Sequence, residues 1–239
     1  MKGFNSSVVG PYFTQNFTQS ELMSFLDPEN LSDLKGLVAE LAIRRCVTPL
    51  KDKDVREEYQ HLVAPWREIC HVELGWKGIA VVEVMKGFTL KVHAPKAGPC
   101  YRNFEYLQSW RPLKNDEPTK KALVFGPPKI VPGSVDKSTT DQLELLACIR
   151  KKYGLPEHHL SNFGSAALNS ALILGHFKRT GDRVPENGFW TRTDTMDALG
   201  DQLNLRFDED GLCCANWHWR DLTQGNLGCF ALGVEELEN

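Results

Sequence analysis

Apolar residues recur at helical spacing early in the chain and predict a helical N-terminal part. Asp27 followed by Pro28 favours a helix start, because an acidic N-cap and a proline in the first turn both suit that position. The apolar stripe of this helix consists of Leu31, Leu34, Leu37, Val38 and Leu41. A second, charged helix is predicted over 52–61, ending before Pro65.

The pattern changes in the central part of the chain. The segments CHVELGW (70–76), GIAVVEVM (78–85) and GFTLKVH (87–93) are short, contain β-branched residues and are punctuated by glycine, so they predict strands. Lys86 and Gly87 are expected to turn a hairpin between the last two. ALVFGPPKIVPG (122–133) predicts another strand, interrupted by consecutive prolines. These segments predict a set of central antiparallel strands.

Two helices are predicted after a linker-like segment, SVDKSTT (134–140). Thr139 and Gln142 have the spacing of a capping box at the start of the first helix. The second helix is expected to begin near Ser161 or Asn162 and to end at Gly181, and its small residues indicate close packing on a neighbour. A boundary between residues 133 and 134 would divide the chain into an N-terminal region, 1–133, and a C-terminal unit, 134–239.

Short strand patterns return at the end of the chain. They are GFWTRTD (188–194), QLNLRF (202–207), GLCCANWHW (211–219) and NLGCFALGV (226–234). The link DEDG (208–211) ends in Asp-Gly, which is a strong hairpin signal. The expected fold class is therefore α+β, in which two C-terminal helices precede a twisted antiparallel sheet.

Composition and charge exclude some classes of function. The 239 residues are 41% apolar and 25% charged, which is typical of a globular protein, and the net charge of -3 argues against a protein that binds nucleic acid by neutralising phosphates. No apolar run is long enough for a membrane span, and the N-terminus lacks the apolar region of a usual signal peptide. The seven cysteines lack C-x-x-C spacing, which predicts reduced thiols, a cytoplasmic location and no zinc site.

The stretch GLCCANWHWRD (211–221) alternates between apolar and polar residues. If it is a strand, one face carries Cys213, Ala215, Trp217 and Trp219 and is expected to be buried. The other face carries Cys214, Asn216, His218 and Arg220 and is expected to be exposed. Because four residues of strand separate Cys214 from His218 by roughly 13 Å, these two cannot form a catalytic dyad directly.

The exposed face is the candidate binding site of the sequence. Exposed aromatic and arginine-rich patches are common at binding hot spots. We expect the ligand, a protein or a small molecule, to contact Asn216, His218, Arg220 and Asp221, with Asp208 and Asp210 at the hairpin end. The acidic hairpin lacks the remaining ligands of a calcium loop, and His158-His159 is expected to diverge on a surface loop.

The last fifty or so residues resemble the C-terminal part of C-type-lectin-like folds. The branch is the one shared by formylglycine-generating-enzyme-like domains and the variable proteins of diversity-generating retroelements, which end on a strand like the one at Asn226, Leu227, Gly228 and Phe230. The catalytic branch's Arg-Gly-Gly-Ser-Trp-like segment and copper-binding cysteine pair have no counterpart here. The resemblance therefore implies a non-catalytic binding module, in which exposed residues vary while Trp217 and Trp219 stay constant.

Two other functions are compatible with the sequence. One is an enzyme with a Cys or His in a pocket, and the other is a structural or assembly protein that buries the same face in a symmetric oligomer. No residue pattern identifies a cofactor. A non-catalytic binding protein is the favoured interpretation.

Overall fold

The computed structural model describes residues 46–51, 55–76, 78–110, 113, 120–185, 188–217 and 225–237. The chain divides into two compact units, Met1–Arg44 and Arg45–Asn239, and every described residue belongs to the second. The helix predicted from Asp27 lies outside the described residues. The second unit combines helices with two sheets, which confirms the α+β class.

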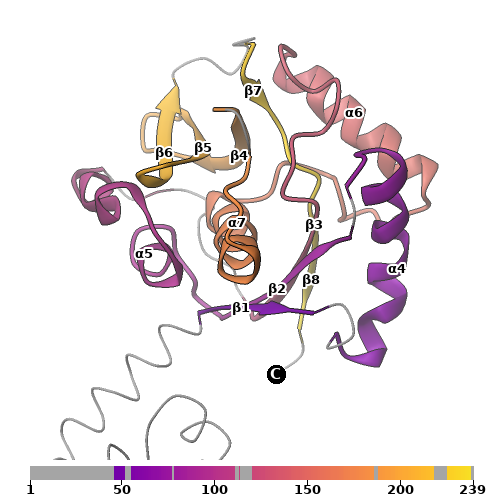
Figure 1. Ribbon diagram of the computed structural model, residues 1–239. Coiled ribbons are helices and arrows are strands. Elements are labelled where there is room, and N and C mark those ends of the chain that lie inside the picture. Colours follow the sequence, from indigo (N-terminus) through magenta and orange to yellow (C-terminus); the bar gives the residue numbers. More distant parts are fainter. Residues whose placement is uncertain are drawn as a thin grey trace, which may run out of the picture. The chain divides into compact units, whose positions relative to one another are not determined.

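The first sheet joins strands from both ends of the unit (Figure 1). Its order is β1 (Val47–Leu50), β2 (Ala80–Val84), β3 (Ala122–Gly126) and β8 (Gly233–Glu236), and all neighbours are antiparallel. The division predicted at 133/134 therefore crosses this sheet, because β8 pairs with β3. The segment predicted to be a linker is also packed into the unit, since Ser134 is fully buried and its Oγ accepts a hydrogen bond from Cys229 N.

The second sheet is mixed. Its order is β6 (Gly211–Trp217), β5 (Gln202–Asp208), β4 (Trp190–Met196) and β7 (Leu227–Gly228). The predicted antiparallel pairing is found among β4, β5 and β6, whereas β7 pairs parallel with β4. The predicted hairpin is confirmed, since Asp208 pairs with Gly211. Gly211 has a φ of 114°, and an added Cβ would lie 2.9 Å from the Pro99 carbonyl, so the position requires glycine.

Helix α4 (Glu57–Val72) is longer than predicted. It passes through Pro65 and includes the start of the 70–76 segment, which is not a strand. The reason is burial, because Val63, Trp66, Ile69 and Cys70 recur at helical spacing and are all enclosed by the core. Tertiary packing outweighs the hydrogen bond that the proline removes.

The 87–93 segment is also not a strand. Its residues form turns that lead into α5 (Ala94–Ala97), followed by the 3-10 segment η3 (Tyr101–Ser109). Phe88 and Leu90 are buried within these turns. The apolar residues of the segment therefore serve the core without strand pairing.

Helices α6 (Thr139–Lys152) and α7 (Ala166–Thr180) confirm the two predicted C-terminal helices. The cap of α6 lies one residue earlier than predicted, where Ser138 and Asp141 form the capping box. Helix α7 ends at Gly181, as predicted, with a φ of 80°. Gly175 allows close packing, because an added Cβ would lie 2.2 Å from Val82 Cγ1.

Helix α7 lies between the two sheets (Figure 1). One core surrounds it and includes residues from both sheets. A second core lies on the other face of the first sheet, under α4 and α6. The first core explains why α7 is buried around most of its circumference.

All seven cysteines lie in the described part of the chain, and none forms a disulfide. Among the described residues, no helix is both long and apolar enough to cross a membrane.

Candidate functional site

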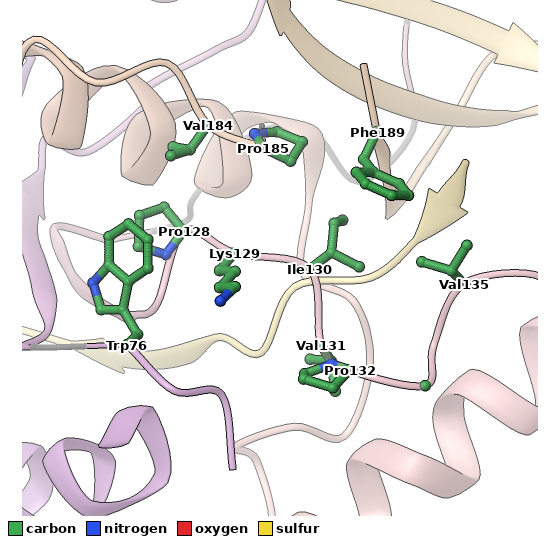
Figure 2. A pocket seen from close by; sticks show the side chains of 11 residues that line it. Trp76, Pro128, Lys129, Ile130, Val131, Pro132, Val135, Val184, Pro185 and Phe189 are labelled. Carbon is green, nitrogen blue, oxygen red and sulfur yellow. The ribbon is translucent and has the colours of Figure 1, made fainter. Parts of the chain in front are cut away.

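An apolar cleft of about 280 Å³ lies among loops that lead out of α4, β3 and α7 (Figure 2). Trp76 and Phe189 provide aromatic side chains, and three prolines provide rigid walls. The lining residues are Trp76, Pro128, Lys129, Ile130, Val131, Pro132, Gly133, Val135, Val184, Pro185 and Phe189. Concave sites with mainly apolar walls and few polar groups are typical of ligand-binding pockets.

The segment 128–133 forms one wall of the cleft because it cannot continue β3. Pro127 and Pro128 lack the N–H groups that a central strand donates. The segment is held instead by backbone hydrogen bonds from Val131 N to Cys229 O, at 2.9 Å, and from Ser134 N to Val131 O, at 3.0 Å. The wall is therefore preformed by contacts that do not involve a ligand.

Lys129 provides the single charge among the eleven described residues that line the cleft. Its Nζ donates to the carbonyl oxygen of Leu74 over 3.2 Å, which positions the ammonium group near Trp76. The other lining side chains offer no carboxylate, thiol, hydroxyl or imidazole group. This arrangement suits an apolar molecule with few polar groups.

Trp76 is backed by a buried histidine. The ring centroids of Trp76 and His176 are 5.6 Å apart, in an edge-to-face arrangement. His176 Nε2 lies 3.2 Å from Thr180 Oγ1, and the burial of the ring lowers the pKa of His176. His176 therefore supports the indole ring as a neutral side chain.

A shallow, polar groove of about 650 Å³ lies at the end of the β5–β6 hairpin. Asp208 and Asp210, two of the predicted binding residues, line it together with Arg183 and Arg206. Arg206 Nη2 lies 2.5 Å from Asp208 Oδ2, and its guanidinium lies 4.7 Å from the centroid of the Trp190 ring. The groove is larger than the cleft but more open. The ion pair between Arg206 and Asp208 neutralises part of its charge.

Asn216 has a structural partner. Its Nδ2 donates to Asp197 Oδ2 over 2.9 Å, which ties β6 to the turn between β4 and β5. His218, Arg220 and Asp221, the other predicted residues, lie outside the described residues, as does Trp219. The structure thus brings Asp208 and Asp210 together and places Asn216 at the opposite end of the same strand pair.

The predicted faces of β6 are exchanged in the described part of the strand. Leu212 and Cys214 are buried, whereas Cys213 and Ala215 are only half-buried. The prediction that Cys214 is exposed is wrong because Cys214 lies opposite Leu205 of β5, on the face that belongs to the core around α7. Tyr106 Oη donates to Cys214 O over 2.9 Å and accepts from Cys214 N over 3.0 Å. The tyrosine thereby pairs backbone groups that an edge strand leaves open.

His158 and His159 do not diverge as predicted. Their Nε2 atoms lie 2.8 Å and 2.6 Å, respectively, from the same atom, Glu235 Oε1. His159 is fully buried, whereas 58% of the His158 side chain is exposed. Leu160, which follows the pair, has a φ of 52°. The turn through these residues brings both rings to the edge strand β8.

These three side chains are close enough to suggest a metal site, since their potential ligand atoms lie within 4.8 Å of one another. Trp66 Nε1 donates to His159 Nδ1 over 3.3 Å, so Nδ1 is unprotonated and Nε2 carries the proton. A metal at Nε2 would require the opposite tautomer, with an acceptor beside Nδ1. The cluster therefore fits a hydrogen-bond chain from Trp66 to Glu235 better than it fits a metal centre.

The buried cysteines are poor candidates for nucleophiles. Burial raises the pKa of Cys46 to about 11 and the pKa of both Cys70 and Cys229 to about 12. A thiol is reactive as the thiolate, which these environments disfavour. The enzyme interpretation has no support from these three residues.

Comparison with known proteins identifies no relative: no family model, curated protein or solved structure matches the chain. The candidate site therefore depends on the geometry of this chain alone. Sequence reasoning missed the cleft because its lining residues come from three separate segments, at 76, 128–135 and 184–189. The one local signal was GPPKIVPG (126–133), whose prolines prevent regular strand pairing and leave apolar side chains in a loop.

Proposed function

We propose that this chain is a non-catalytic binding protein that holds an apolar ligand in the cleft between Trp76 and Phe189. The observation that carries the proposal is the lining, in which ten uncharged residues accompany a single lysine. Burying apolar ligand surface against such walls contributes about 25 cal/mol per Å². The rigid loop 128–133 reduces the cost of ordering the site.

Binding of the neutral dye Nile red tests this proposal. We expect a saturable increase in its fluorescence with one equivalent bound. Phe189→Ser should weaken binding about tenfold, because the variant removes one aromatic wall. Phe189 is half-buried and belongs to neither hydrophobic core, so the variant should fold. Leu199→Ser is the matched control, since Leu199 is exposed and does not line the cleft. Equal affinity in both variants, or no binding to the wild type, would contradict the proposal.

A second candidate is a protein-binding surface on the C-terminal strands. The observation in its favour is that Asp208 and Asp210 line a groove beside Arg183 and Arg206. Arginine is enriched at protein interfaces. The resemblance to variable proteins of diversity-generating retroelements adds the proposal that the polar residues of the predicted binding face, Asn216, His218 and Arg220, differ between gene copies. Sequencing 212–226 across a natural population tests it: variation with Trp217 and Trp219 constant supports the proposal, and an invariant segment opposes it.

A further inference from the structure

We propose that the ligand of the cleft is a small amphipathic carboxylate, whose apolar body contacts the walls and whose anionic end pairs with Lys129. This inference rests on the proposed function and names the class of ligand. Its basis is the charge of the lining, because Lys129 is not balanced by an acidic residue among the described lining residues.

The position of the ammonium group supports a specific role for it. Lys129 Nζ is held by the Leu74 carbonyl at 3.2 Å, which uses one of its three donors. Within the described part of the chain, no carboxylate lies within ion-pair distance of this nitrogen. The remaining donors can therefore serve an anion that enters the cleft.

The distribution of groups along the cleft sets the shape of the ligand. Figure 2 shows Lys129 on the same side as Trp76, with Phe189 on the far side beyond Ile130. A molecule that spans this space meets a cation at one end and an aromatic ring at the other. An aromatic ring joined to a carboxylate by a short methylene chain satisfies both ends.

A single lysine selects a monoanion in preference to a phosphate ester. Phosphate groups are commonly bound by several cations or by an array of backbone N–H groups, and the planar fork of arginine suits them better. The cleft offers one ammonium group and no arginine among its described lining residues. The charge therefore matches one carboxylate.

The test compares 3-phenylpropionate with its neutral analogue 3-phenylpropionamide by isothermal titration calorimetry on the full chain. We expect the acid to bind about fivefold more tightly than the amide, which is near the upper end of the range measured for exposed ion pairs. Lys129→Met should remove this preference and leave amide binding unchanged, whereas Lys129→Arg should retain it. Lys96→Met is the control, since Lys96 is exposed and lies outside the cleft.

Each outcome separates this inference from the proposed function. Equal binding of acid and amide to the wild type, or a preference that survives in Lys129→Met, overturns the carboxylate inference while the apolar cleft stands. If neither compound nor Nile red binds, both the inference and the proposed function are overturned.

Discussion

The buried ring of His159 donates a hydrogen bond from Nε2 to Oε1 of Glu235 over 2.6 Å. The donor comes from the loop after α6, and the acceptor comes from β8, which is 76 residues further along the chain. Trp66 completes the chain from α4 by donating to His159 Nδ1. Three distant segments are thus joined at one edge of the second core.

Glu235→Ala is expected to destabilise the protein by about 1–3 kcal/mol, because it leaves the Nε2–H of His159 buried without its acceptor. Urea unfolding at neutral pH measures the change in the free energy of unfolding. Glu236→Ala is the matched control, since Glu236 is exposed and pairs with Lys120 on the surface. Similar losses in the two variants would show that the buried hydrogen bond is not important for stability.

The pH dependence of stability provides a second test of the hydrogen bonds that join Trp66, His159 and Glu235. Burial lowers the pKa of His159 below its ordinary value of 6.5, although Glu235 opposes the shift. The unfolded state therefore takes up a proton before the folded state does, and the free energy of unfolding should fall as the pH drops below 6.5.

His159→Gln should reduce this loss of stability, measured by urea unfolding from about pH 8 to pH 5. The slope of the free energy of unfolding against pH reports the titration of His159. A loss of stability that the substitution causes equally at every pH does not change this slope. The same slope in the wild type and in His159→Gln would assign the loss of stability to other groups, of which His176, whose pKa is also lowered by burial, is a described candidate.

Asp194 is expected to change the stability with pH in the direction opposite to that of His159. Burial raises the pKa of its carboxyl group from 3.8 to about 6, and Oδ2 has no hydrogen-bond partner among the described residues. The charged form therefore destabilises the folded state as the pH rises from 3.8 to about 6 and above.

The change in the free energy of unfolding caused by Asp194→Asn should consequently be more favourable at about pH 8 than near pH 4, by about 2–3 kcal/mol. The asparagine can keep the Oδ1 that accepts from Phe163 N. Thermal unfolding at both pH values, with the exposed Asp210→Asn as control, measures the difference. A gain that does not depend on pH would be incompatible with a raised pKa at this position.

Tyr106→Phe is expected to destabilise the edge of the second sheet by about 1–3 kcal/mol, because the hydroxyl pairs both the N–H and the carbonyl of Cys214. Hydrogen exchange should show faster exchange at the Cys214 amide. Tyr101→Phe serves as control, since the Tyr101 ring contacts Tyr106 but its hydroxyl has no hydrogen bond among the described residues. Unchanged exchange at Cys214 would remove this role from Tyr106.

The local sequence predicted the elements whose signals lie within a few residues. The predicted start of α6 is one residue from the observed cap at Ser138, and the end of α7 at the left-handed Gly181 is as predicted. Gly211 marks the β5–β6 hairpin. Periodicity was less informative where a segment is buried on more than one side. The stretch 70–76 has a strand-like composition but begins inside α4, because Ile69 and Cys70 are already part of a helical apolar face.

Only the tertiary structure decided which residues meet across long distances in the sequence. The alternation in β6 shows that the strand has two faces, but its register with β5, which sets Cys214 opposite Leu205 in the core around α7, determines which one is covered. Long-range packing also decides the pairing of β8 with β3, the convergence of His158 and His159 on Glu235, and the meeting of the three segments that line the cleft. Local patterns encode how each segment folds, whereas the partner of a face depends on which surfaces bury the most apolar area together.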